Sequence, residues 1–100
     1  MNRLSIMRRA NGDLFTLMSK GQEVLAVWPS LESAIQYKAR NPELTVFIPI
    51  TVESPFAQKR LGPLQKKDFG LFLLADTKIA LLKDGRKMRW AEMEQSSKSS

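Results

Sequence analysis

The side chains best suited to binding are basic, and half of the 16 lysines and arginines gather in two clusters in the second half of the chain. The first cluster consists of Lys59, Arg60, Lys66 and Lys67. The second lies within "KDGRKMRW" and consists of Lys83, Arg86, Lys87 and Arg89. Ammonium and guanidinium groups bind carboxylates and phosphates, so both clusters predict contact with an acidic protein or with nucleic acid.

Each cluster also has a purely structural interpretation. The first could be the solvated face of a helix whose other face carries Ala57, Leu61 and Leu64. The second could protect an edge strand from pairing with another chain. Trp90 could stack on a base, but the expected strand register places it with apolar residues, which favours a core position. Arg8 and Arg9 flank a turn and could extend either cluster.

Few residue types remain for catalysis, because the chain has no histidine and no cysteine. Ser-His-Asp triads, Cys-His pairs and the usual zinc sites are therefore excluded. The glycines are isolated, so there is no phosphate-binding loop. Asp68, Asp76 and Asp84 fall at expected strand boundaries, where Asp bonds the local backbone. We expect no enzyme, metal or cofactor; a carboxylate or lysine enzyme would need a deep pocket converging on an acid.

Composition indicates a small basic globular protein. The 100 residues are 43% hydrophobic and 26% charged, with a net charge of +6 and a pI of about 10.0. This length suits one domain, expected over 1–94, with a disordered tail over 95–100. No apolar run approaches the roughly 18 residues that span a bilayer. The N-terminus lacks the pattern of a secretory signal. We therefore expect a cytoplasmic protein without membrane insertion.

The first third of the chain predicts an antiparallel meander. "RLSIMRR" and "DLFTLMS" flank Asn11-Gly12, the strongest short hairpin signal. A two-residue loop there would pair Ile6 with Leu17 and Arg8 with Phe15, so that Leu4, Ile6, Phe15 and Leu17 share one face. A second turn at Lys20-Gly21 would pair Leu17 with Val24 and Phe15 with Ala26, and would place Trp28 farther along that face.

The pattern changes period at Trp28-Pro29-Ser30. Pro29 cannot donate to a strand ladder, and Ser30 is a good helix N-cap. A helix is expected to bury Leu31, Ala34, Ile35 and Ala39 and to end at Asn41-Pro42. Trp28 would then anchor this helix to the sheet. The stretch "LTVFIPI" predicts a strand that Pro49 confines to an edge or terminus.

The second half predicts another helix and further strands. Ser54-Pro55 begins a helix that Gly62-Pro63 shortens or kinks, and "FGLFLLAD" is typical of a central strand. Asp84-Gly85 predicts a hairpin that pairs Leu81 with Met88 and Ile79 with Trp90. The expected fold is α+β, with a mainly antiparallel sheet of about five to seven strands and two helices packed on one face. Its order is β-β-β-α-β-α-β-β.

Part of the chain resembles a known family. The resemblance rests on "EVLAVWPSLESA", a strand with "VFIPI", a helix with "RLGPL" and the strand "GLFLLAD". Between Leu14 and Asp76 it resembles the domain of unknown function 2750 family, and more loosely the N-terminal domain of SseB-like proteins. Ala26 stands where the family usually has Pro, and the chain is basic where the family tends to be acidic. The resemblance implies an order of elements and no activity.

Two functional hypotheses follow from these residues. The first is a small non-catalytic accessory or regulatory module that docks a basic surface onto a larger acidic protein or complex. The second is sequence-independent nucleic-acid binding through the basic C-terminal hairpin. The second predicts an affinity that falls steeply as the salt concentration rises.

Overall fold

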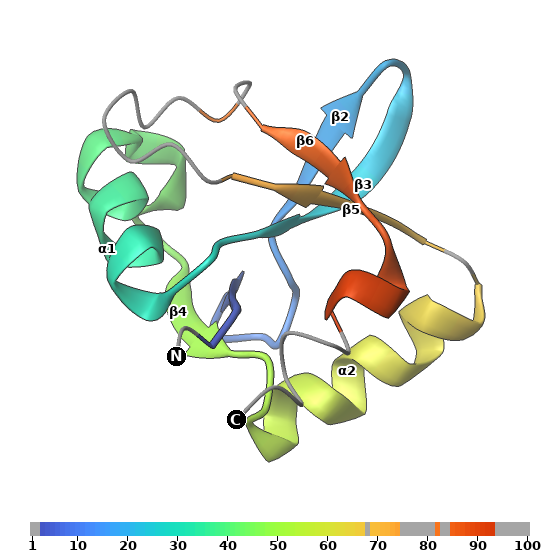
Figure 1. Ribbon diagram of the computed structural model, residues 1–100. Coiled ribbons are helices and arrows are strands. Elements are labelled where there is room, and N and C mark those ends of the chain that lie inside the picture. Colours follow the sequence, from blue (N-terminus) through green and yellow to red (C-terminus); the bar gives the residue numbers. More distant parts are fainter. Residues whose placement is uncertain (1–2, 68, 75–81, 83–84, 94–100) are drawn as a thin grey trace.

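The fold belongs to the α+β class, as expected from the order of sequence patterns. The computed structural model describes residues 3–67, 69–74, 82 and 85–93 (Figure 1). Its elements are β1 (Ser5–Arg8), β2 (Thr16–Ser19), β3 (Gln22–Val27), α1 (Leu31–Arg40), the 3-10 helix η1 (Pro42–Leu44), β4 (Ile48–Thr51), α2 (Pro55–Lys66), β5 (Gly70–Leu73) and β6 (Arg86–Met88). Residues 90–93 are also helical.

The strands form two sheets, where the sequence predicted one. The larger sheet has the order β2-β3-β5-β6, and the smaller pairs β1 with β4. All pairs are antiparallel except β3 with β5, which is parallel. The sheets meet where Ser5 and Trp28 exchange two backbone hydrogen bonds of 2.8 Å.

The chain reverses direction at Asn11-Gly12 as predicted, but the predicted pairing of the first two strands is wrong. β1 pairs with β4, Ile6 opposite Ile50. Its backbone meets the following segment at the Arg8–Leu14 bridge and where the Phe15 N–H donates to the Met7 carbonyl at 2.9 Å. The turn is wider than two residues, because Asn11 Oδ1 accepts the Asp13 N–H at 3.0 Å and the Arg9 N–H donates to the Asp13 carbonyl at 2.8 Å.

The second predicted turn is confirmed. Leu17 pairs with Val24, and the Ala26 N–H donates to the Phe15 carbonyl at 3.3 Å. Lys20 and Gly21 have φ angles of 51° and 81°. Two successive positive φ angles are what a two-residue hairpin turn requires.

Two apolar cores lie on opposite sides of β3 and β5. Leu25, Val27, Leu71 and Leu73 face one core, which Ala57 and Leu61 of α2 cover. Ala26, Trp28 and Leu74 face the other, which Ala34 and Tyr37 of α1 cover. Burial on both faces explains the continuous apolar runs in these strands. The two helices therefore pack on opposite faces (Figure 1), and their predicted placement on one face is wrong.

Helix α1 begins as predicted but buries a different face. Ser30 Oγ accepts the Ser33 N–H at 3.1 Å, which confirms the N-cap. The buried residues are Ser33, Ala34 and Tyr37, whereas Leu31, Ile35 and Ala39 are exposed. The reason is the Tyr37 ring, which meets Trp28 at 5.9 Å and sets the rotation of the helix. Large aromatic surfaces outweigh smaller aliphatic ones in such a choice.

The segment after α1 forms a shorter strand than expected. Pro42–Leu44 is a 3-10 helix, so β4 occupies only residues 48–50 of the predicted 44–50 strand and extends beyond it by one residue, Thr51. Within the described residues β4 pairs with β1 alone. This is consistent with the edge position that Pro49 predicted.

Helix α2 is capped as expected and runs through its proline. Ser54 Oγ accepts the Ala57 N–H at 3.1 Å, and Pro55 occupies the first turn. Ala57 and Leu61 are buried, while Pro63 lies inside the helix. Proline removes one internal hydrogen bond, so packing of the apolar face must hold the helix together.

The C-terminal part adds β6 to the edge of β5. Leu71 pairs with Met88, and Phe72 pairs with Lys87. Residues 75–81, 83, 84 and 94–100 lie outside the described residues, and with them the predicted partner strand, its Asp84 turn position and the tail. No helix among the residues described is long and apolar enough to cross a membrane.

Candidate binding site

A groove lies between α2 and the segments before and within β2 and β3. It encloses about 770 Å³ and is lined by Gly12, Asp13, Leu14, Thr16, Glu23, Phe56, Lys59, Arg60, Pro63, Leu64 and Phe69. Leu14, Leu64 and Phe69 are half-buried and pack against the core beneath α2. Two of the predicted contact residues, Lys59 and Arg60, therefore border a groove with an apolar floor.

Phe56 connects β1 to the basic face of α2. The guanidinium carbon of Arg8 lies 4.7 Å from the centre of the Phe56 ring, and that of Arg60 lies 5.4 Å from it. Such cation–π contacts stabilise both guanidinium groups in positions over the Phe56 ring. Arg8 thus lies next to the first basic cluster, which consists of Lys59, Arg60, Lys66 and Lys67 and is called the α2 cluster below. This is one of the two clusters that the sequence suggested Arg8 could extend. Arg9 lies over another ring, Phe47, at 5.9 Å.

Gly12 is where the turn after β1 meets α2. Its φ angle is +94°, and a Cβ at this position would overlap the guanidinium of Arg60. Only glycine accepts this conformation without strain and leaves the guanidinium its place. The end of the Arg60 side chain therefore lies directly against the backbone of Gly12.

Alanine at Gly12 is expected to destabilise the protein by more than alanine at Gly21. Both positions have positive φ, which costs alanine about 1–2 kcal/mol. Gly21 has open space around its Cα, whereas Gly12→Ala also displaces Arg60 from Phe56, adding about 0.5–1 kcal/mol. Urea unfolding of both variants measures the difference. The added cost should vanish in an Arg60→Ala background; its persistence there would contradict the contact.

The α2 cluster is exposed and carries unbalanced charge. Lys59, Arg60, Lys66 and Lys67 are all exposed, as the solvated-face interpretation required. No carboxylate occurs from Ser54 to Lys67. Within the described residues, none of the four cations forms an ion pair. The helix dipole favours Lys66 in the last turn, but it gives no reason for Lys59 and Arg60 at mid-helix.

The structure does not gather the four α2 cations at one point. Lys59 and Arg60 line the groove with Phe56 and Pro63. Lys66 and Lys67 do not line it and extend the charge past its end.

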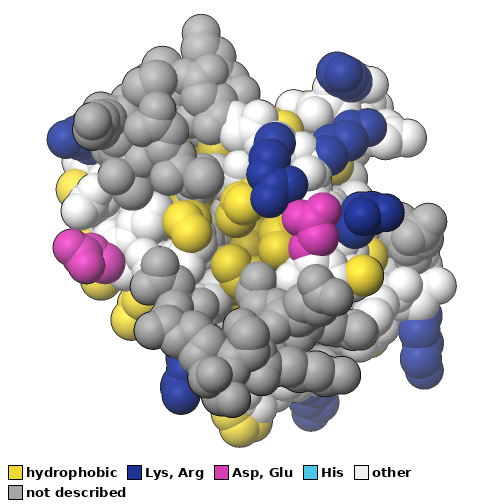
Figure 2. Space-filling view, viewed as in Figure 1, with side chains coloured by type: hydrophobic (Ala, Val, Ile, Leu, Met, Phe, Trp, Pro, Cys, Tyr) yellow, Lys and Arg dark blue, Asp and Glu magenta, His cyan; other side chains and the backbone are white. Residues whose placement is uncertain are grey.

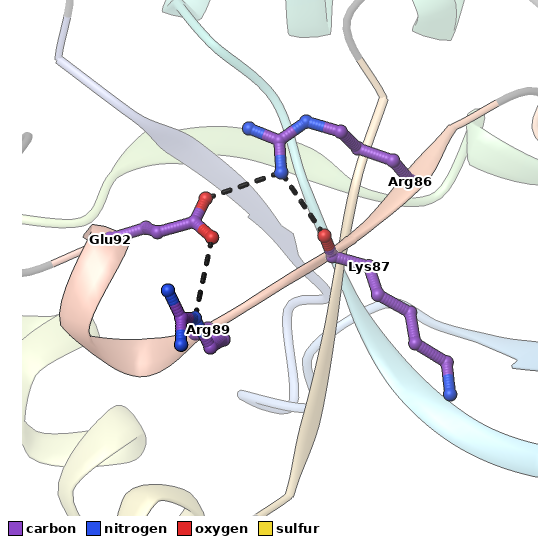
Figure 3. Close-up of polar contacts among 4 residues, drawn as sticks. All are labelled: Arg86, Lys87, Arg89 and Glu92. Atoms are coloured by element: carbon purple, nitrogen blue, oxygen red, sulfur yellow. Dashed lines mark hydrogen bonds and ion pairs between the residues drawn. The ribbon is translucent and has the colours of Figure 1, made fainter.

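The second cluster is partly neutralised by an acid from the following helical turn. Glu92 forms ion pairs with Arg86 at 3.2 Å and with Arg89 at 3.8 Å. Its carboxylate lies between the two guanidinium groups, while Lys87 points away (Figure 3). Figure 2 shows basic side chains over β6 around an acidic one. Lys83, the remaining predicted contact of this cluster, lies outside the described residues.

The Trp90 side chain is held in place by contacts within the fold. Its Nε1–H donates to the Phe69 carbonyl at 2.7 Å, and its partly buried ring packs against the core beneath α2. This confirms the core interpretation over the base-stacking one. Trp90 begins a helical turn rather than continuing a strand, and its predicted partner Ile79 lies outside the described residues.

The rim of the groove opposite α2 is acidic. Asp13 and Glu23 line it, and both are exposed. The Asn11 side-chain amide donates to Asp13 at 3.1 Å, and the Thr16 hydroxyl donates to Glu23 at 2.7 Å. In the part of the chain that the structure describes, no ion pair crosses the groove. The two rims therefore face each other with opposite, unpaired charges.

A second hollow lies at the other end of the β2–β3 hairpin. It encloses about 560 Å³ and is lined by Leu17, Met18, Ser19, Lys20, Asn41, Glu43, Phe72 and Leu82. Lys20 is the one basic residue among these lining residues, and it belongs to neither of the two predicted basic clusters. Over residues 3–67, 69–74, 82 and 85–93, no group of three potential metal ligands occurs.

Comparisons of the chain with protein-family models and with curated proteins gave no significant match. The resemblance to the domain of unknown function 2750 family therefore stays an expectation.

Proposed function

We propose that this protein is a small non-catalytic module that docks onto an acidic protein through α2. The observation that carries the proposal is the charge of this helix. Four cations and no carboxylate lie between Ser54 and Lys67, and none of these cations is paired within the described residues. Within the fold this charge gains only the contact of Arg60 with Phe56 and the effect of the helix dipole at Lys66, whereas unpaired cations attract and orient an acidic partner.

The second basic cluster, with Arg86, Lys87 and Arg89 on and next to β6 (the β6 cluster), supports docking less well. Glu92 contacts both Arg86 and Arg89, so a ligand would have to compete with a carboxylate already in place. Only Lys87 of the described cations there is free of this acid (Figure 3). Nucleic-acid binding through this cluster would thus lose much of its electrostatic drive.

Two charge-reversal variants, one in each basic cluster, test which cluster binds the partner. Lys59→Glu with Arg60→Glu changes the groove, and Arg86→Glu with Lys87→Glu is the matched control. Both lower the net charge by four. Tagged wild-type protein should retain a salt-eluted acidic partner from cells that express it. The partner should be lost with the α2 variant and kept with the β6 variant. Equal retention by both variants would overturn the proposal.

Nucleic acid is tested on the same proteins. Mobility-shift titrations with 20-nucleotide single strands and 20-base-pair duplexes at low salt should show no binding. Binding through four to five phosphate contacts would instead give a slope of log K against log salt of roughly −4. A slope of that size, abolished by the β6 variant, would replace the proposed function with nucleic-acid binding.

A further inference from the structure

The floor of the groove is more apolar than binding of charge alone requires. Leu14, Leu64 and Phe69 offer half-buried apolar surface between the two rims. Each packs on the core beneath and leaves part of its side chain uncovered. Apolar surface at the bottom of a concavity gains free energy when another apolar side chain covers it.

The two rims of the groove carry charges of opposite sign. Lys59 and Arg60 stand on the α2 side, with Arg8 held near them through Phe56. Asp13 and Glu23 stand on the other side, each hydrogen-bonded to a neutral side chain. A ligand with carboxylates on one side is attracted to α2 and repelled from the opposite rim, so its orientation is fixed.

We propose that this groove binds a short segment of the partner that carries an apolar side chain flanked by Asp or Glu. The apolar side chain covers Leu14, Leu64 and Phe69, and the carboxylates lie against Lys59 and Arg60. The inference rests on the proposed function and names the part of the acidic partner that is recognised. The volume of about 770 Å³ suits a few side chains of a peptide.

A nucleic-acid strand fits this groove poorly. Its phosphates would meet Asp13 and Glu23 on one rim, and a backbone of phosphate and sugar gains little from an aliphatic floor. A carboxylate-bearing peptide matches both the basic rim and the floor.

Selection from a random library of displayed 16-residue peptides tests the inference. We expect the immobilised protein to enrich peptides in which Leu, Phe, Trp or Met stands beside Asp or Glu. Replacing that apolar residue by serine in a synthetic copy should weaken binding about ten- to hundredfold, the worth of one buried side chain. Isothermal titration measures both peptides.

Two tryptophan variants locate the binding. Thr16→Trp places a large ring in the groove, whereas Met18→Trp is its control on the same strand, at a position 70% exposed and outside the groove. Far-ultraviolet circular dichroism and thermal unfolding verify that both fold. Thr16→Trp should remove the preference for the apolar peptide over its serine copy, and Met18→Trp should keep it. Loss with both or with neither would overturn the groove as the site.

The outcomes separate the inference from the proposed function. Enrichment of acidic peptides with no preferred apolar residue, bound through Lys59 and Arg60, would overturn the inference and leave acidic docking standing. Failure to enrich acidic peptides at all would overturn the inference, and the proposed function would then stand or fall with retention of the acidic partner by the two charge-reversal variants.

Discussion

Replacing Trp28 by alanine is expected to lower the free energy of unfolding by about 3–5 kcal/mol. The side chain is fully buried at the end of β3. Its ring lies 6.4 Å from Phe15 and 5.9 Å from Tyr37, so it joins the sheet to α1. Alanine leaves a cavity that neither the strand nor the helix can fill. Urea unfolding followed by circular dichroism gives the change.

Ile35→Ala provides the control on the helix that Trp28 anchors. Ile35 is 53% exposed and belongs to the face that the sequence expected to be buried. Its truncation should cost about 1 kcal/mol or less, because little apolar area returns to water. A Trp28→Ala cost no larger than that of Ile35→Ala would refute the anchoring role.

The second large effect is expected at Leu61. Leu61→Ala should lower the free energy of unfolding by about 2–5 kcal/mol. Leu61 is 4% exposed and holds α2 against β3 and β5. The helix contains Gly62 and Pro63, which cost about 1 and 3 kcal/mol relative to alanine in a helix interior. Helix α2 therefore depends on tertiary packing more than an ordinary helix does.

Hydrogen exchange distinguishes this dependence from a general loss of stability. At low denaturant, Leu61→Ala should speed exchange of the α2 amides more than that of β3. Lys66→Ala, at an exposed position of the same helix, should change the free energy of unfolding by less than about 0.5 kcal/mol. Uniform acceleration across α2 and β3 would contradict the local dependence.

Local chemistry accounts for the features that the sequence predicted correctly. Ser30 and Ser54 cap their helices because each hydroxyl reaches an amide three residues ahead. Lys20-Gly21 makes a tight turn because the residues on either side continue directly into paired strands. None of these features needs a partner distant in the sequence.

The mistaken predictions concern distant partners. Asn11-Gly12 has the composition of a hairpin loop, yet β1 finds its partner in β4, about forty residues later. A local sequence signal carries no information about a distant strand that competes for the same pairing edge. The rotation of α1 was missed for a related reason, because the contact of Tyr37 with Trp28, which lies outside the helix, decides which side is buried.

The candidate site was predicted in part. Basic composition pointed to Lys59 and Arg60, but the roles of Arg8, Phe56 and Gly12 depend on the approach of β1 to α2. The position of Phe56 one helical turn before Arg60 was a detectable signal, since residues four apart on a helix are neighbours. The acidic rim carried no signal, because Asp13 and Glu23 come from a turn and a strand.

The parallel pairing of β3 with β5 has a consequence for the order of folding. Val24 pairs with Gly70, so the chain must close a loop of 46 residues, 70 minus 24, before this contact forms. The β2–β3 hairpin closes locally and can form far sooner. Since α2 lies inside the long loop, its wall of the groove is set only after β5 has joined. A chain still emerging from the ribosome thus cannot form the groove until β5 has been synthesised.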